Sequence, residues 1–150
     1  MIDFHDNPQL IAGGLAIDNR GSLAFVNDLS LNEFERFYVI QNHEAGFVRA
    51  WHGHKIERKA FFVVQGSVQV SCVEVKNFES PARDQEVHSF ILDSRLPRVL
   101  IVPPGYANGL KSLSSNAIVL VYSSLNLEQS AADDFRFPHD YWNPWHVTPR

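Results

Sequence analysis

The sequence predicts an all-β sandwich or barrel, on three observations. Short runs of β-branched and aromatic residues recur along the chain, and turn residues bound each run. Several runs alternate apolar and polar residues, as strands with one buried face do. Almost no stretch has helical periodicity. With 150 residues, 45% of them hydrophobic, the chain is expected to form one domain, 1–150, around a single core.

The expected strands follow one another at short intervals. They are the runs SLAFVND, RFYVIQN, GFVRAWH, KAFFVVQGSVQVSCVEV, VHSFILD, RVLIVPP and NAIVLVYSS. In the long run, Gly66 supplies the permissive backbone of a tight hairpin turn. After this turn one face is expected to carry Val68, Val70, Cys72 and Glu74, and the other Ser67, Gln69, Ser71 and Val73.

Two segments are expected to form a helical turn or two, SLNEFER and LEQSAADDF, because both begin near residues that cap helices. The aromatic and proline-rich residues 133–150 suit an extended tail packed on the barrel or on a second subunit. Trp142 and Trp145 lie in this tail.

The composition narrows the classes of function. A net charge of −4 argues against a general nucleic-acid binder, although a few arginines can still bind a small anion locally. The single cysteine, Cys72, lies in an apolar run and is expected to be a buried structural residue. The first ten residues lack a signal-peptide pattern, and no apolar run has the length of a membrane span, so a cytoplasmic location is expected.

Two histidines in the motif WHGH raise the question of a metal site. Five residues separate Gly46 from His52, one residue separates His52 from His54, and Gly66 closes the following hairpin. This spacing resembles the first signature of the cupin superfamily, the small double-stranded β-helix or jelly-roll barrels. The resemblance implies a ligand glutamate where Lys59 stands and a ligand histidine where Asn108 follows the P-x-G turn.

A metal site with these substitutions is not expected. A lysine ammonium would place a positive charge where the cation sits, and an asparagine amide is a poor substitute for imidazole. The sequence is therefore interpreted as a cupin that has kept a polar pocket and needs no metal and no cofactor. A metal-dependent cupin oxygenase stays open as a third alternative, and elemental analysis would reveal it.

The residues around WHGH suggest proton transfer. If VRAWHGHK is one regular strand, His52 and His54 share a face with Val48 and Ala50, whereas Arg49, Trp51 and Lys55 share the other. Two histidines can accept and return a proton near neutral pH, and a lysine can stabilise an enolate. This combination favours proton abstraction beside a carbonyl group. The alternative is that ERK, residues 57–59, is only a solvated charge run.

Five motifs in order sharpen the resemblance: DNRGSL, RAWHGH, KAFFVVQG, VPPGYANG and LVYSS, spread over roughly residues 15–125. Together they resemble the nucleotide-sugar cupins, the dTDP-4-dehydrorhamnose 3,5-epimerases and the dTDP-4-keto-6-deoxyhexose 3,4-ketoisomerases. The resemblance implies a role in deoxysugar biosynthesis for polysaccharide or lipopolysaccharide, with a dTDP-linked sugar as substrate.

The resemblance also implies roles for individual residues. His52 matches the base, and Lys59 matches the lysine that steadies the enolate. His54 matches the second histidine of the ketoisomerase motif H-A-H-K, and either His54 or Tyr122 is expected to be the acid. The residues expected to bind the substrate are Arg20, Arg49, Tyr38 and Asn108.

Some positions depart from the family pattern. Asn108 stands where the epimerases have histidine, and LNL at 125–127 replaces an aromatic pair. The acid that orients the catalytic histidine has three candidates, Asp133, Asp134 and Asp140. The remaining histidines, among them His5 and His43, have no partner spacing and are expected to be structural or exposed.

Two functions follow as hypotheses. The first is a cofactor-free isomerase or epimerase of a nucleotide-linked 4-keto-6-deoxy sugar, and the resemblance does not separate epimerisation from ketoisomerisation. The second is a non-catalytic cupin that binds a carbohydrate or a nucleotide sugar. In either case a homodimer is expected, because jelly-rolls of this size leave edge strands that pair or exchange between subunits.

Overall fold

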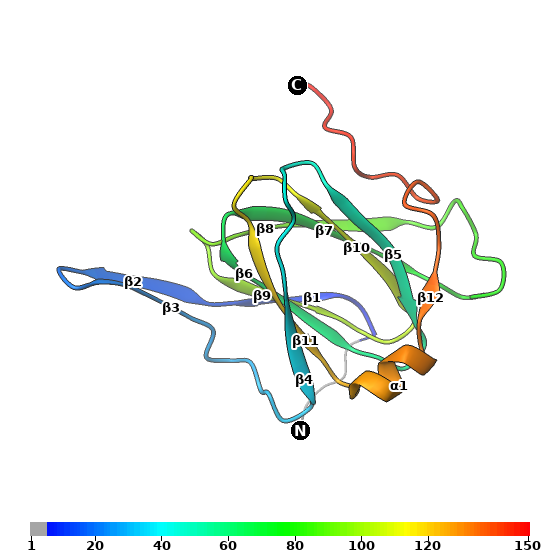
Figure 1. Ribbon diagram of the computed structural model, residues 1–150, viewed down its shortest axis with the longest axis horizontal. Helices are drawn as coiled ribbons and strands as arrows, with labels where there is room; N and C mark the ends of the chain where they lie inside the picture. Colours follow the sequence, from blue (N-terminus) through cyan, green and yellow to red (C-terminus); the bar gives the residue numbers. More distant parts are fainter. Residues whose placement is uncertain (1–5) are drawn as a thin grey trace.

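The computed structural model describes residues 6–150; His5 lies outside the described residues. Two five-stranded antiparallel sheets pack face to face to form a jelly-roll barrel (Figure 1). The first sheet has the strand order β1-β9-β6-β11-β4, with β1 Gln9–Ala12, β9 Arg98–Val102, β6 Lys59–Gln65, β11 Ile118–Ser123 and β4 Arg36–Ile40.

The second sheet contains the histidine motif. Its order is β12-β5-β10-β7-β8, with β12 Phe135–Arg136, β5 Val48–His54, β10 Tyr106–Ser112, β7 Ser67–Glu74 and β8 Val87–Asp93. One short helix, α1 Leu127–Ala132, precedes β12. A separate hairpin, β2 Gly14–Asp18 and β3 Gly21–Phe25, projects from the barrel (Figure 1).

The core between the sheets follows the alternation in the sequence. Val68, Val70 and Cys72 of β7 point into it, together with Phe61 and Val63 of β6. Val73 faces the other side of β7 and packs against Trp51. Gly66, with a φ of 77°, makes the β6–β7 turn as expected. The prediction of an all-β jelly-roll is confirmed.

The two segments with helical potential behave differently. LEQSAADDF does form a helix, α1, because Asn126 and Gln129 make a reciprocal capping box at its start. The expectation of a helical turn in SLNEFER is wrong: residues 30–35 form a turn and an irregular segment, and Arg36 already belongs to β4. Here the pairing of β4 with β11 outweighs the local helix propensity.

The C-terminal aromatic segment packs on the outer face of the second sheet. The rings of Trp51 and Trp142 meet edge to face, with their centroids 5.3 Å apart, and Trp145 lies against the same ring of Trp51. The indole of Trp51 donates hydrogen bonds to the carbonyls of His139 and Trp142. The segment therefore braces β5 from outside the barrel, opposite the face that carries the histidines.

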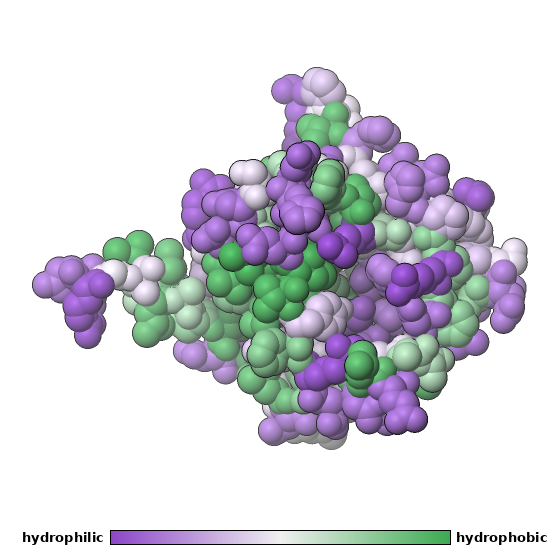
Figure 2. All heavy atoms as spheres, in the orientation of Figure 1, coloured by the Kyte–Doolittle hydropathy of each residue, from purple (hydrophilic) through white to green (hydrophobic). Residues whose placement is uncertain are grey.

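The β2–β3 hairpin is the most exposed apolar element. The side chains of Ile17 and Leu23 are 74% and 62% exposed, and those of Phe37 and Val39 on the edge strand β4 are also largely exposed. Figure 2 shows apolar residues gathered on the hairpin and on the adjoining face of the barrel. Within residues 6–150, no helix is both long enough and apolar enough to span a membrane.

We predict that Trp142→Ala lowers the free energy of unfolding by about 3–5 kcal/mol, because it empties a buried aromatic site and leaves the carbonyl of Ala82 without its indole donor. Urea unfolding measures the loss. Val147→Ala, at an exposed position of the same segment, serves as the control. A loss below about 1 kcal/mol would show that the segment does not brace the barrel.

Candidate active site

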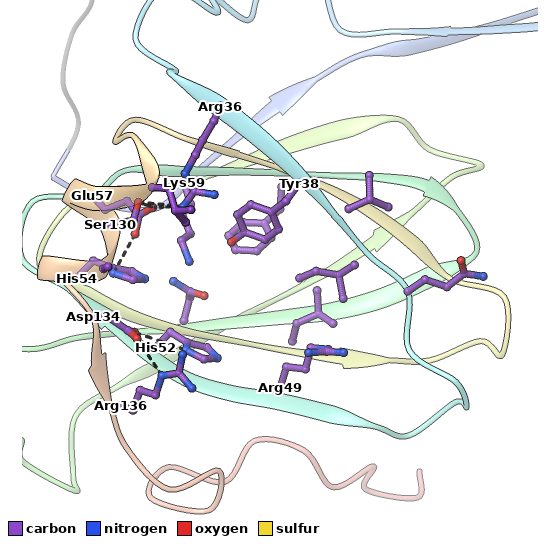
Figure 3. Close-up of a pocket in the computed structure, with 18 residues that line it drawn as sticks. Arg36, Tyr38, Arg49, His52, His54, Glu57, Lys59, Ser130, Asp134 and Arg136 are labelled. Atoms are coloured by element: carbon purple, nitrogen blue, oxygen red, sulfur yellow. Dashed lines mark hydrogen bonds and ion pairs between the residues drawn. The ribbon is translucent and has the colours of Figure 1, made fainter.

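A cavity of about 610 Å³ opens between the two sheets at the end near α1 and β12 (Figure 3). It is lined from both sides: β4 and β6 of the first sheet, β5 and β10 of the second, and residues of α1 and β12. A cavity of this size can hold a small organic ligand. Most of the residues that the sequence singled out lie on its wall.

The strand β5 brings three cationic or titratable side chains to the cavity, His52, His54 and Arg49. The sequence predicted Arg49 on the opposite face from the histidines, and this is wrong. The pairing of β5 with β10 shifts register, so that Asn108 lies opposite His52 but Leu110 lies opposite Arg49. One extra residue in β5 lets Ala50 and Trp51 both face the C-terminal segment, and Arg49 returns to the cavity.

Lys59 is the first residue of β6 and is 8% exposed. Its ammonium lies over the ring of Tyr38, 5.8 Å from the centroid, and both side chains line the cavity. The alternative that ERK is a solvated charge run is therefore wrong, because Glu57 and Lys59 are both buried. A buried ammonium requires a nearby anion, and the structure supplies Glu57.

Glu57 was not singled out by the sequence, yet it is the most enclosed charge in the cavity. Its carboxylate accepts hydrogen bonds from the hydroxyls of Ser123 and Ser130 and lies 3.0 Å from Nδ1 of His54. Burial alone would raise its pKa. The hydrogen bond from His54, the charge of Lys59 and the hydrogen bond from Ser123 outweigh burial and lower the pKa of Glu57 to about 2.

His54 is buried and held at one nitrogen only. Its Nδ1 lies 2.8 Å from the carbonyl oxygen of Asp133 and 3.0 Å from the carboxylate of Glu57. Its Nε2 is buried and has no hydrogen-bond partner among the described residues. Nδ1 of this ring is therefore satisfied, whereas Nε2 has no partner within residues 6–150, although His54 belongs to the cavity wall.

His52 has a different environment. Its Nδ1 is 3.9 Å from the carboxylate of Asp134, and its side chain is 34% exposed. Burial, followed by the positive charge of Lys59, lowers the pKa of His52 to about 4, although Asp134 acts in the opposite direction. At neutral pH His52 is therefore uncharged and able to accept a proton.

The three candidate aspartates after α1 lie in three different environments. Asp133 accepts hydrogen bonds at its carboxylate from the backbone N–H groups of Lys55, Ile56 and Glu57. Asp134 lies beside His52 and accepts a hydrogen bond from Arg136. Asp140 is exposed and is not part of the cavity wall. Of the three candidates, the structure brings Asp134 to His52.

Three arginines and Asn108 also line the cavity. Arg49 donates a hydrogen bond to the side chain of Asn42, and Arg36 donates to the carbonyl of Leu125 and to Ser130. Arg136 is largely exposed at the mouth. Asn108, beside His52 on β10, is buried and faces the cavity.

Two residues expected at the site are not brought to it. Tyr122 lies between Val121, which is in the core, and Ser123, which contacts Glu57, so it points to the outer face of the sheet and packs near Phe34 and Phe37. Arg20 lies on the turn of the projecting hairpin, where it pairs with Asp18. Within one chain, neither can act on a molecule in this cavity.

Among residues 6–150, no group of three or more His, Cys, Asp or Glu side chains is arranged to hold a metal ion. The buried ammonium of Lys59 and the amide of Asn108 stand in the positions that the cupin signature gives to two ligands. This donor set does not suit a divalent cation.

Comparisons with known structures agree with the jelly-roll. The dTDP-4-dehydrorhamnose 3,5-epimerase of Bacillus anthracis str. Ames, with TDP and PPi bound, is 25% identical, with a TM-score of 0.76 over 99% of this chain and 90% of that chain. The WlaRB TDP-quinovose 3,4-ketoisomerase of Campylobacter jejuni is 23% identical, with a TM-score of 0.67 over 91% of this chain and 98% of that chain.

A third solved structure, the dTDP sugar isomerase of Desulfovibrio desulfuricans G20, is 19% identical, with a TM-score of 0.73 over 89% of this chain and 85% of that chain. Comparison with curated proteins gives no significant match. The sequence itself matches the family described as FdtA: WxcM-like, C-terminal, over residues 6–142. Because the match spans nearly the whole chain, the protein belongs to this FdtA, WxcM-like C-terminal family.

Proposed function

We propose that this protein is a cofactor-free isomerase or epimerase of a nucleotide-linked 4-keto-6-deoxy sugar. The observation that carries the proposal is the convergence of two histidines and a buried lysine on one cavity, with an uncharged His52 between charged neighbours. The family and the likeness to a 3,5-epimerase whose structure holds TDP support the same chemistry.

The proposed first step is removal of a proton from the carbon beside the ketone. His52 accepts the proton, the electrons of the C–H bond form a carbon–carbon double bond, and the carbonyl oxygen becomes an enolate oxygen. The ammonium of Lys59 is close enough to the ring of His52 to lower its pKa, and so it is placed to stabilise this oxyanion. No electron acceptor is required, because the sugar is neither oxidised nor reduced overall.

The second step returns a proton. In an epimerisation the same carbon receives it from the opposite face. In a ketoisomerisation the former carbonyl carbon receives it. The neighbouring hydroxyl loses its proton to become the new ketone, and that proton passes to the former carbonyl oxygen, which becomes a hydroxyl. Because Tyr122 lies outside the cavity, we assign the acid to His54 rather than to Tyr122.

The anionic part of the substrate requires cations at the wall. Arg49 has donors beyond its single bond to Asn42, and Arg136 lies at the mouth. We propose that these guanidinium groups contact the diphosphate, since a planar guanidinium suits phosphate oxygens. Tyr38 and Asn108 line the interior and are proposed to contact the sugar.

A homodimer is part of the proposal. The exposed apolar side chains of the β2–β3 hairpin and of the edge strand β4 form a surface that a second copy of this chain would cover. Such packing would carry the hairpin, with Arg20, onto the partner. The cytoplasmic location expected from the sequence remains a prediction.

The proposed chemistry predicts exchange of carbon-bound hydrogen with solvent. Incubation with a dTDP-4-keto-6-deoxyhexose in heavy water is expected to place deuterium at C3 or C5, as measured by NMR or mass spectrometry. His52→Ala should lower the exchange rate by about 100-fold or more, because the base is lost. His43→Ala, at an exposed position outside the cavity, should not.

Exchange in the His52→Ala variant at the wild-type rate would remove His52 from the mechanism. Tight binding without any exchange by the wild-type protein would instead support the second function, a nucleotide-sugar binder. Asn108, in place of the histidine of the epimerases, and LNL at 125–127, in place of their aromatic pair, favour this alternative.

The pKa of His52 sets the pH dependence. A base must be uncharged to accept a proton, and His52 becomes charged only as the pH falls towards about 4. Exchange at saturating substrate should therefore change little between pH 8 and about 6 and should decline as the pH approaches about 4. A decline already centred near the ordinary histidine value would contradict the assignment.

If the protein is a dimer, disruption of the hairpin surface should lower the mass of the particle in solution to that of one chain. Ile17→Glu combined with Leu23→Glu places two charges on the exposed apolar face and should give a monomer in analytical ultracentrifugation. Val147→Glu, equally exposed in the C-terminal segment, should leave the mass unchanged. A wild-type protein that sediments as a monomer would contradict the proposal directly.

A further inference from the structure

The hydrogen-bonding partners of His54 decide where its proton lies. The carbonyl oxygen of Asp133 and the carboxylate of Glu57 both approach Nδ1, at 2.8 Å and 3.0 Å. Both groups are acceptors only, since a carbonyl has no hydrogen and the carboxylate, with a pKa of about 2, is ionised. Nδ1 must therefore carry a hydrogen and donate it, whether the ring is neutral or protonated.

The second ring nitrogen of His54, Nε2, remains for contact with a bound molecule. Nε2 of His54 is buried and has no partner among the described residues, although His54 lines the cavity wall. A buried polar atom without a partner is uncommon, and a catalytic role is one of the explanations for it. Nε2 is thus the one position of this ring that can take a proton from a bound molecule or give one to it.

Glu57 is built to remain a fixed anion beside this ring. Its side chain is 1% exposed, its Oε1 accepts from the hydroxyls of Ser123 and Ser130, and its Oε2 faces His54. The guanidinium of Arg36 lies 3.7 Å from Oε1. The two hydroxyls and the guanidinium orient one oxygen, so the other oxygen is held towards Nδ1.

We propose that Glu57 is a positioning residue for the proposed isomerase or epimerase: it holds His54 with Nδ1 protonated, so that Nε2 alone exchanges a proton with the substrate. When Nε2 holds a proton, the ring is an imidazolium, and the adjacent carboxylate stabilises that charge. Glu57 does not touch the substrate; it acts through His54. This inference rests on the proposed function only for its kinetic consequence.

The two histidines consequently differ in their task. Among residues 6–150, His52 has no carboxylate within hydrogen-bonding distance, since Asp134 is 3.9 Å away, and it stays uncharged. His54 has a carboxylate and a carbonyl on one nitrogen and an open second nitrogen. The carboxylate and carbonyl that hold His54, and the greater distance of Asp134 from His52, support our assignment of His54 as the acid and His52 as the base.

The first test needs no substrate. In protein labelled with ¹⁵N at histidine, long-range ¹H–¹⁵N spectra at neutral pH distinguish the ring nitrogens of His54, which His54→Gln identifies by loss of its signals. We expect Nδ1 to carry a hydrogen. A neutral ring protonated at Nε2 instead would overturn the inference, whatever the protein is found to catalyse.

The second test separates positioning from folding. Glu57→Gln keeps the shape and removes the charge, so the exchange rate at saturating substrate should fall by about 10- to 100-fold. KM should stay within about twofold, because Glu57 makes no contact with the substrate. Glu79→Gln, an exposed carboxylate in the 75–86 loop, is the matched control and should leave both values unchanged.

A graded variant keeps the test decisive if Glu57→Gln does not fold. Ser130→Ala removes one hydroxyl from the carboxylate but keeps its charge, so it should lower the exchange rate less than Glu57→Gln and leave Nδ1 protonated. An unchanged rate in folded Glu57→Gln, or a rise in KM as large as the loss in rate, would overturn the positioning role. Absence of exchange in the wild-type protein would instead refute the proposed function while leaving the spectrum of His54 to decide the inference.

Discussion

The carboxylate of Asp133 holds the candidate site together. It is buried, and it accepts hydrogen bonds from three successive backbone N–H groups, those of Lys55, Ile56 and Glu57. Its own backbone carbonyl meets His54. A buried charge is tolerated when it is satisfied in this way, and here it ties the end of α1 to the turn between β5 and β6. That turn delivers Glu57 and Lys59 into the cavity, so their placement depends on a residue more than 70 positions later in the chain.

The charges inside the cavity then constrain one another. Lys59 is buried, and Glu57 provides the compensating anion. Burial, together with the positive charge of this ammonium, lowers the pKa of His52 and keeps its ring uncharged. In the proposed mechanism this lysine offers a positive charge for an oxyanion and helps to keep the imidazole of His52 uncharged, so that it can accept a proton.

The outer surfaces of the two sheets serve different purposes. The C-terminal tryptophans cover the second sheet and hold β5 in place behind the histidines, so the strand that presents them is packed on both faces. The first sheet carries exposed apolar side chains at β4, and the hairpin beside it is apolar and unsupported within one chain. The C-terminal segment thus covers the outer face of the second sheet but not that of the first.

Residue pattern alone predicted the strands β3 to β9 and β11, the hairpin turn at Gly66 and the core-facing side of β7, and it placed Lys59 at the start of its strand; β1, β2, β10 and β12 were not among the predicted strands. These features depend on periodicity of two and on backbone preference, which are local properties. The sequence could also propose that Tyr38 and Asn108 belong to the same site, through the resemblance of its motifs.

Tertiary structure decided the rest. Arg49 reaches the cavity because β5 has one extra residue relative to β10, and Tyr122 misses it because the pairing of β11 with β6 points Val121 and Ser123 inward. The sequence did not single out Glu57 within the ERK run, and only the contacts from Ser123, Ser130 and His54 show where its carboxylate lies. Register and long-range contacts arise when distant segments meet, so no local pattern specifies them. The sequence by itself determined which reactive side chains the protein has. The packing of the two sheets determined which of them lie in one cavity.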